Sequence, residues 1–275
     1  MTTNSVLTEN AARTPEATLR EVIEALAPIE RAAGSPGEKR AAEWIAERLT
    51  RAGAEAHVDV ERFRGDWAGV IAGLSAVGVA SGILAGTRAG RRAGIAGGLA
   101  AAGLIADDIS NGLRPFRKLV RPERETWNVV AEAGDPDGDR TLVVLAHHDA
   151  AQTGAIFDPT FQEKLIDTFP GVVERLDTSL PLWWGVIAGP ALAAAGGITG
   201  RHGLARAGTV LSALSTAAMA DIQRSPTVPG ANDNLTAVAT LVALAEALRD
   251  RPVEGVRGQL VPAGAGETLQ GGIYG

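Results

Sequence analysis

The feature that most constrains the fold is an apolar run that ends abruptly in polar residues, TLVVLAHHDAA at positions 141–151. Apolar residues fill positions 142–146, and His147, His148 and Asp149 follow at once. This pattern is typical of a strand buried in a parallel sheet, and ligand sites of α/β proteins lie beyond the carboxyl ends of such strands. We therefore predict that residues 141–146 form an interior strand whose end presents His147, since an exposed apolar edge would promote aggregation.

A second polar cluster, GANDN at positions 230–234, places Asp233 just before an apolar run at 235–248 whose spacing predicts a helix. A histidine, a carboxylate two residues on and a second aspartate at a helix start form a donor set that suits zinc. The chain has no cysteine, so any metal must be held by His, Asp and Glu. The alternative, histidines that cap a strand without a metal, stays open.

The remaining pattern alternates helices with strands. Apolar spacing predicts helices over residues 15–33 and 38–51, and short strands near 57–63, 127–133 and 259–261. The segment GDPDGD, at 134–139, predicts a turn between two strands. This alternation predicts an α/β fold with a mostly parallel sheet flanked by helices on both faces.

Two apolar insertions interrupt that fold. Residues 67–86 and 180–200 are each about 20 residues without charge, and each is followed by an arginine-containing break and about 14 more uncharged residues. A bilayer span needs about 20 apolar residues, whereas 10–14 suit a buried or re-entrant helix. We therefore predict two apolar helical hairpins, at residues 67–107 and 180–221, each with one long and one short arm.

These hairpins predict a lipid bilayer as a partner. Glycines spaced four apart allow helices to approach closely in lipid, and tryptophans at the arm ends suit the membrane interface. The residues are Gly78, Gly82, Gly86, Gly90, Gly94, Gly98, Trp67, Trp183 and Trp184. A water-soluble bundle rich in alanine and glycine is the alternative interpretation.

The net charge of the chain and its N-terminal segment indicate which partners it can bind and where in the cell it can lie. A net charge of -6 argues against a nucleic-acid partner, because phosphate binding needs a basic surface. The first 22 residues have neither a basic n-region nor an apolar h-region, so we expect no signal peptide. Basic residues are more numerous in the flanks of the insertions than in their loops, which favours a membrane protein with its folded domain on the cytoplasmic side.

Three segments resemble, in order, the signatures of the M28 family of zinc metallopeptidases. LVVLAHHDA resembles the family's H-x-D strand end, PGANDNLTAVATLVALAEAL its Asp-Asn turn before a helix, and GAGETLQGG its Glu pair after a strand. GSPGEKRAAEWIAERLTRAGAEAHVDV and ETWNVVAEAGDPDGDRTLVVLAHHD resemble the family's first segment and first core hairpin. The resemblance implies a zinc-peptidase-like three-layer sandwich over residues 15–65, 122–179 and 222–275.

The resemblance also implies a role for each matching residue. His147 would ligate one zinc ion, Glu267 the other, and Asp233 would bridge the two. Asp149 would form a hydrogen bond with the imidazole of His147 and so fix its tautomer. The implied activity is hydrolysis of a peptide substrate, aminopeptidase-like, by metal-activated water. We interpret His148 as structural, and His57 and His202 as surface residues.

Two departures from the family pattern bear on activity. Gly266 occupies the position of the family's general base, whose loss typically costs about 10²–10⁴-fold in rate. The family's remaining Asp and His ligands lie downstream of Gly275, so the resemblance implies a fold incomplete at its C-terminus. We expect a membrane-associated M28-type zinc metallopeptidase with impaired catalysis. The alternative is a non-catalytic M28-fold binding or scaffold protein docked on the membrane.

Overall fold

The computed structural model of the chain describes residues 14–168, 170–173 and 184–273. Residues 180–183 of the second predicted hairpin, Trp183 among them, and the first 13 of the 22 residues assessed for a signal peptide lie outside these residues. The chain divides into two compact units. Unit 1 comprises Met1–Phe63, Arg124–Ala151 and Thr227–Gly275, and unit 2 comprises Arg64–Glu123 and Gln152–Pro226.

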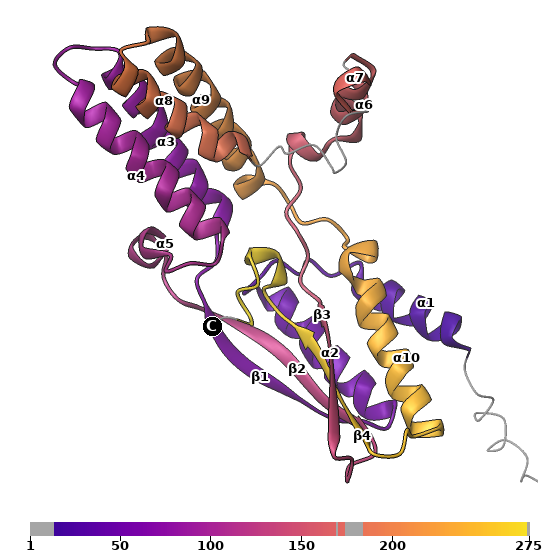
Figure 1. Cartoon of the computed structure of the whole chain (residues 1–275). Helices are drawn as coiled ribbons and strands as arrows, with labels where there is room; N and C mark the ends of the chain where they lie inside the picture. The colour runs from indigo at the N-terminus through magenta and orange to yellow at the C-terminus, as the bar shows by residue number, and fades with distance from the viewer. Residues whose placement is uncertain (1–13, 169, 174–183, 274–275) are drawn as a thin grey trace, which may run out of the picture. The chain divides into compact units, whose positions relative to one another are not determined.

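Unit 1 contains a four-stranded sheet in the order β1-β2-β4-β3 (Figure 1). Its strands are β1 (Glu55–Phe63), β2 (Arg124–Gly134), β3 (Arg140–His147) and β4 (Val256–Ala263). β1 pairs antiparallel with β2, and β2 pairs antiparallel with β4. Among the described strands, only β3 and β4 pair in parallel. The α/β class is therefore present, but the prediction of a mostly parallel sheet is wrong because the sheet is mixed.

The chain segments that connect the strands explain why the sheet contains both parallel and antiparallel pairs. Parallel neighbours need a crossover connection, usually a helix, and in unit 1 only β3 and β4 are joined through one, α10 (Thr236–Asp250). β2 and β3 are joined by a short turn in which Asp137 N donates to Asp135 Oδ1 at 3.1 Å. β4 then inserts between them, so the two strands that flank this turn are not paired with each other.

β3 is an edge strand among the described residues, so the prediction of an interior strand is also wrong. Leu142 is 54% exposed and Leu145 is 51% exposed. The interior place belongs to β4, whose Gly258 and Leu260 are buried. An apolar run shows that a strand can be buried, but it does not show which neighbour occupies the interior.

Helices α1 (Pro15–Leu26), α2 (Pro36–Arg51) and α10 form the core of unit 1 with the sheet. Thr14 and Ser35 accept a hydrogen bond from the first turns of α1 and α2, and a proline follows each. The core gathers on the strand face that carries Val129 and Ala131. The described part of unit 1 therefore has one layer of helices and one sheet, where three layers were predicted.

Unit 2 is helical. Its elements are α3 (Trp67–Ala85), α4 (Arg91–Ile109), α5 (Pro115–Val120), η1 (Ala155–Phe157), α6 (Pro159–Thr168), α7 (Pro170–Val173), α8 (Trp184–Thr199) and α9 (His202–Arg224). α3, α4, α8 and α9 pack as a four-helix bundle (Figure 1). Among the described residues, α3 is the one helix whose length and mean hydropathy of 1.9 suffice to cross a membrane.

Candidate metal centre

His147 is the last residue of β3, where it pairs with Ala263 of β4. The next residue continues the ladder, since His148 N donates to Ala263 O at 2.9 Å. Ala150 N then donates to Arg31 O at 2.9 Å, which turns the chain away from the sheet. The imidazole of His147 is thus held at the carboxyl end of a strand, as the sequence predicts.

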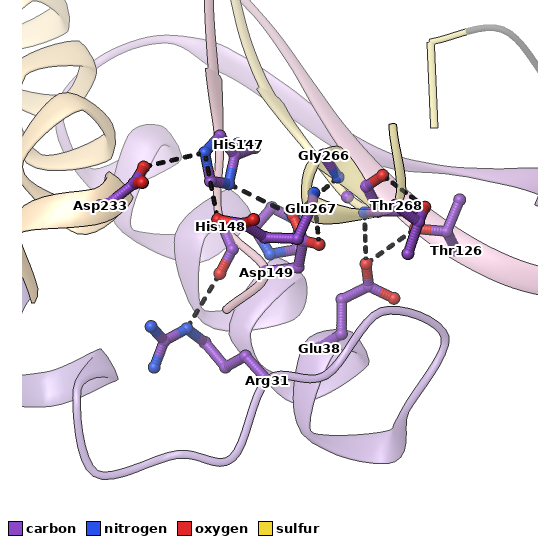
Figure 2. A network of polar contacts seen from close by, with 12 residues as sticks. Arg31, Glu38, Thr126, His147, His148, Asp149, Asp233, Gly266, Glu267 and Thr268 are labelled. Atoms are coloured by element: carbon purple, nitrogen blue, oxygen red, sulfur yellow. Dashed lines mark hydrogen bonds and ion pairs between the residues drawn. The ribbon is translucent and has the colours of Figure 1, made fainter. Parts of the chain in front are cut away.

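The structure brings His147, Asp233 and Glu267 together from three different elements (Figure 2). His147 Nε2 lies 3.2 Å from Asp233 Oδ1 and 3.8 Å from Glu267 Oε1. One ligand atom from each residue lies within 4.8 Å of the other two. Asp233 comes from the turn η2 (Ala231–Leu235) ahead of α10, and Glu267 from η3 (Gly266–Thr268) after β4.

Asp149 lies on the opposite side of the imidazole from Asp233 (Figure 2). Its Oδ1 is 3.4 Å from His147 Nδ1, and its side chain is fully buried. Its two oxygens also accept hydrogen bonds from Gly266 N at 2.8 Å and Glu267 N at 3.0 Å. Asp149 therefore orients the ring and holds the loop that carries Glu267.

The electrostatics of the cluster follow from its three carboxylates. Burial lowers the pKa of His147, but Asp149, Glu267 and Asp233 outweigh it and raise that pKa to about 9. Burial, together with the negative charges of Asp149 and Asp233, raises the pKa of Glu267 to about 7. Without a cation the cluster therefore retains protons near neutral pH, and a divalent ion would displace them.

A buried arginine supports the Asp233 side of the site. Arg31 is fully buried, and its guanidinium donates to His148 O at 2.9 Å and Pro229 O at 2.8 Å. It also donates to Leu26 O and to Ile29 O. Arg31 thus ties the end of α1 to the end of β3 and to the loop that leads to Asp233.

A buried glutamate supports the Glu267 side. Glu38 accepts hydrogen bonds from Ala265 N at 2.7 Å, Thr126 Oγ1 at 2.8 Å and Gly34 N at 2.7 Å. Burial, and then the nearby Asp149 carboxylate, raise the pKa of Glu38 to about 7. Neither Glu38 nor Arg31 was predicted from the sequence. Ser35 and Glu38 match a helix capping box, which was the available signal for Glu38, but such a box does not indicate contact with a distant loop.

Gly266, at the predicted general-base position, packs directly against His147. A Cβ on Gly266 would lie 2.4 Å from His147 Cβ and 2.6 Å from His147 Cγ. A side chain at this position therefore requires His147 to shift. The carboxylate that this loop contributes to the cluster with His147 and Asp233 is therefore that of Glu267.

The other histidines lie apart from the cluster. His148 is fully buried and its Nε2 is 2.9 Å from Trp127 O, consistent with a structural role. Burial lowers the pKa of His148, so it stays neutral in the core. His57 is exposed and lies 3.4 Å from Asp59, and His202 is exposed at the start of α9.

The donor set of His147, Asp233 and Glu267 fits one zinc ion, and the second ion that the resemblance implies stays a prediction. Zinc prefers imidazole nitrogen and carboxylate oxygen at about 2.0–2.2 Å, and catalytic sites keep three protein ligands and one open position. Donor atoms around such an ion lie about 3–4 Å apart, close to the separations from His147 Nε2 to Asp233 and Glu267. The outer carboxylate on Nδ1 is the arrangement that orients a ligating histidine.

No protein-family model and no curated protein sequence matches this chain. Similar solved structures include the glutaminyl cyclases of Fimbriiglobus ruber (12% identity, TM-score 0.44) and Tannerella forsythia (11% identity, TM-score 0.43). They also include an aminopeptidase from Aneurinibacillus sp. strain AM-1 (13% identity, TM-score 0.43). These alignments cover 91%, 91% and 94% of this chain, and 45%, 46% and 65% of the respective structures. They do not establish a family.

Proposed function

We propose that this chain is a zinc-binding hydrolase of the M28 peptidase type that acts on peptide bonds, with an aminopeptidase-like substrate. The observation that carries the proposal is the convergence of His147, Asp233 and Glu267 on one point, with Asp149 behind the imidazole. These residues come from three segments that resemble the M28 signatures. A bound zinc ion would supply Lewis acidity and lower the pKa of a coordinated water.

The residues of the chain have distinct tasks in this proposal. His147, Asp233 and Glu267 would hold the ion. Asp149 keeps His147 Nε2 facing the ligand point, because Nδ1 faces its carboxylate. Asp233 is exposed, so the site is open to a peptide from solvent on that side. Glu38 and Arg31 fix the two loops that carry the carboxylate ligands.

One observation favours a second candidate, a zinc-binding but non-catalytic M28-type scaffold. Gly266 leaves the site without the carboxylate that would accept a proton from the attacking water, and its contact with His147 leaves no space for a side chain. If Glu267 ligates the ion, it does not serve as that base. We therefore propose low activity rather than full peptidase activity.

We also propose that the chain works at a membrane. α3 is long and apolar enough to cross a bilayer, and half of it is buried against other parts of unit 2. Expressed in cells, the full chain should sediment with membranes and resist alkaline carbonate. Recovery in the soluble fraction without detergent would contradict the membrane location and leave the metal proposal intact.

A single assay tests the enzymatic proposal. The detergent-purified chain, stripped of metal and reloaded with zinc, is incubated with a panel of aminoacyl anilides and short peptides. We expect slow, zinc-dependent release of the N-terminal residue that is lost in His147→Ala and Glu267→Gln. His57→Ala, which removes an exposed histidine beside a carboxylate, is the matched control and should keep the activity.

The outcomes separate the two candidates. Zinc binding that depends on His147, without turnover of any substrate, supports the scaffold. Turnover that survives His147→Ala contradicts the proposed site. Failure to bind zinc contradicts both candidates and supports the interpretation in which the histidines only cap a strand.

A further inference from the structure

The four long helices of unit 2 share a charge-free zone. Residues 68–85 of α3, 93–106 of α4, 185–198 of α8 and 207–220 of α9 contain no Asp, Glu, Lys, Arg or His. The helices pack in the cyclic order α3, α4, α8, α9, and α3 also packs against α8 across the bundle. The zone therefore forms one continuous layer through the bundle rather than one apolar helix among polar ones.

The fully exposed part of this layer is apolar, and the hydroxyls of its half-buried Thr209 and Thr216 donate to backbone carbonyls of α9. Every exposed residue in these four ranges is Gly, Ala, Val, Leu or Ile. Ile83 is 59% exposed, Leu99 54% and Leu214 64%. A helix at the surface of a water-soluble bundle carries polar residues on its outer face. We call this surface, made of the exposed residues of the four ranges, the apolar belt.

The interior of the layer carries four serines. Ser75, Ser81, Ser212 and Ser215 are buried in it. The hydroxyls of Ser75 and Ser212 have no hydrogen-bond partner among the described residues. Polar groups inside and apolar groups outside reverse the order of a water-soluble bundle, and they match helices that are solvated by lipid.

Glycines let the helix backbones meet. A Cβ on Gly94 of α4 would lie 2.4 Å from Ala85 N of α3, and a Cβ on Gly208 of α9 would lie 2.3 Å from Ala193 N of α8. Close backbone approach of this kind stabilises helix pairs in membranes, where burial of apolar surface supplies no driving force between helices. The glycines support the inference but do not carry it, since they also occur in tight soluble bundles.

Charges mark both ends of the layer. At the two hairpin tips five exposed arginines and no acidic residue occur, namely Arg88, Arg91, Arg92, Arg201 and Arg206. At the opposite end Asp108 forms a buried ion pair with Arg117, and Asp107 accepts from Leu113 N and Arg114 N. Asp107 and Asp108 are thus satisfied within unit 2. At the tips, Arg91 donates to Gly197 O and Ile198 O at the end of α8, and the other four arginines are exposed.

We infer that α3, α4, α8 and α9 cross a lipid bilayer together, as two hairpins whose apolar belt contacts the acyl chains. The inference rests on the proposed membrane location and is independent of the metal centre. The charge-free parts of α4 and α9 are about 14 residues, or ~21 Å, against about 30 Å for a typical hydrocarbon core. Tip arginines that extend to the headgroups and local thinning of the bilayer make up the difference.

The absence of cysteine from the sequence allows a direct test. Single cysteines replace the exposed belt residues in Ile83→Cys, Leu99→Cys and Leu214→Cys of the full chain. Leu142→Cys in β3 is the matched control, because Leu142 is as exposed as Leu99. Intact membranes from expressing cells are treated with a charged, membrane-impermeant maleimide, from either side, and labelling rates are compared with those after denaturation.

We expect belt cysteines to react at least about tenfold more slowly than Leu142→Cys in membranes and at similar rates after denaturation, because the reactive thiolate needs water. Belt cysteines that react as fast as the control from an aqueous side would overturn the inference. If the chain is found in the soluble fraction, the membrane location itself fails.

A second pair of positions tests crossing against surface attachment. Ala89→Cys lies at the tip of the first hairpin, and Leu119→Cys lies on α5, beyond the end of α4. We expect the two to be labelled from opposite sides of sealed vesicles. Labelling of both from the same side would show that the hairpins lie on or dip into the membrane, and would overturn the crossing.

Discussion

Glu38, in the first turn of α2, accepts a hydrogen bond from the backbone amide of Ala265 at 2.7 Å across 227 positions of sequence. The same carboxylate accepts from Thr126 and from Gly34 N, so one buried group joins α2, β2 and the loop that carries Glu267. This contact makes the geometry of the candidate site depend on a residue outside it.

Glu38→Ala should lower the free energy of unfolding by about 2–4 kcal/mol, because two backbone amides and a hydroxyl lose their acceptor in the core. It should also weaken zinc binding, since the Glu267 loop loses an anchor. Urea titration with pulse proteolysis and zinc titration measure the two effects. Glu47→Ala, an exposed change on the same helix, should alter stability by less than about 0.5 kcal/mol. Equal effects of the two substitutions would contradict this role.

Protonation of Glu38 should make the free energy of unfolding depend on pH. Its folded-state pKa, about 7, lies above the ordinary value of 4.5, so the folded state binds the proton more tightly than the unfolded state. The stabilising contribution is therefore complete below pH 4.5 and is lost as the pH rises through 7, about 3 kcal/mol in all. Glu38→Gln should make the metal-free stability profile less steep between pH 4.5 and 7, where Glu267, whose pKa is also about 7, still contributes. Glu47→Gln should leave the profile unchanged.

Zinc affinity should rise with pH because protons compete for the ligands. His147, with a pKa of about 9, must lose its proton to bind, and below pH 7 Glu267 must lose one as well. We expect the affinity to rise about tenfold per pH unit between 7 and 9, and more steeply below 7. Competition titrations with a chelator of known proton affinity measure the slope. An affinity independent of pH from 6 to 8 would show that these residues do not hold the ion.

The contact between Gly266 and His147 predicts that even a methyl group is harmful at position 266. Gly266→Ala should weaken zinc binding by more than about tenfold, because the new Cβ displaces the imidazole, and interactions that orient a ligand typically contribute 10–100-fold. Gly103→Ala is the control, since a Cβ there meets no atom within 4 Å and the residue lies inside α4. It should raise helix stability slightly and leave zinc binding unchanged. Equal zinc affinity in the two variants would contradict the packing at His147.

The sequence was sufficient to predict where the candidate ligands lie along the elements. His147 follows an apolar strand and Asp233 lies in a polar turn before an apolar helix, so both can be found from their neighbours, whereas Glu267 was predicted only from the resemblance to the M28 signatures. Position within the sheet could not be predicted in this way. The run at β3 has the same composition whether β3 is interior or an edge, and the place of β4 between β2 and β3 depends on pairings across more than a hundred residues.

Arg31 and Glu38, which support the site, could not be predicted for the same reason, because their partners are distant in the sequence. Arg31 contacts His148 O and Pro229 O, backbone atoms that any residue type would offer at those positions. Nothing in the local pattern distinguishes Arg31 from an exposed arginine such as Arg40. Charged residues that are buried by distant backbone contacts become visible only once the fold is known.

The most direct test of the central claim is the zinc stoichiometry of the metal-stripped chain, measured by calorimetric titration with His147→Ala, Asp233→Asn and His57→Ala in parallel. The account predicts one high-affinity ion per chain, an affinity lowered by more than about 100-fold in His147→Ala and Asp233→Asn, and no change in His57→Ala. Equal binding in all four proteins, or no binding in the unmodified chain, would contradict it.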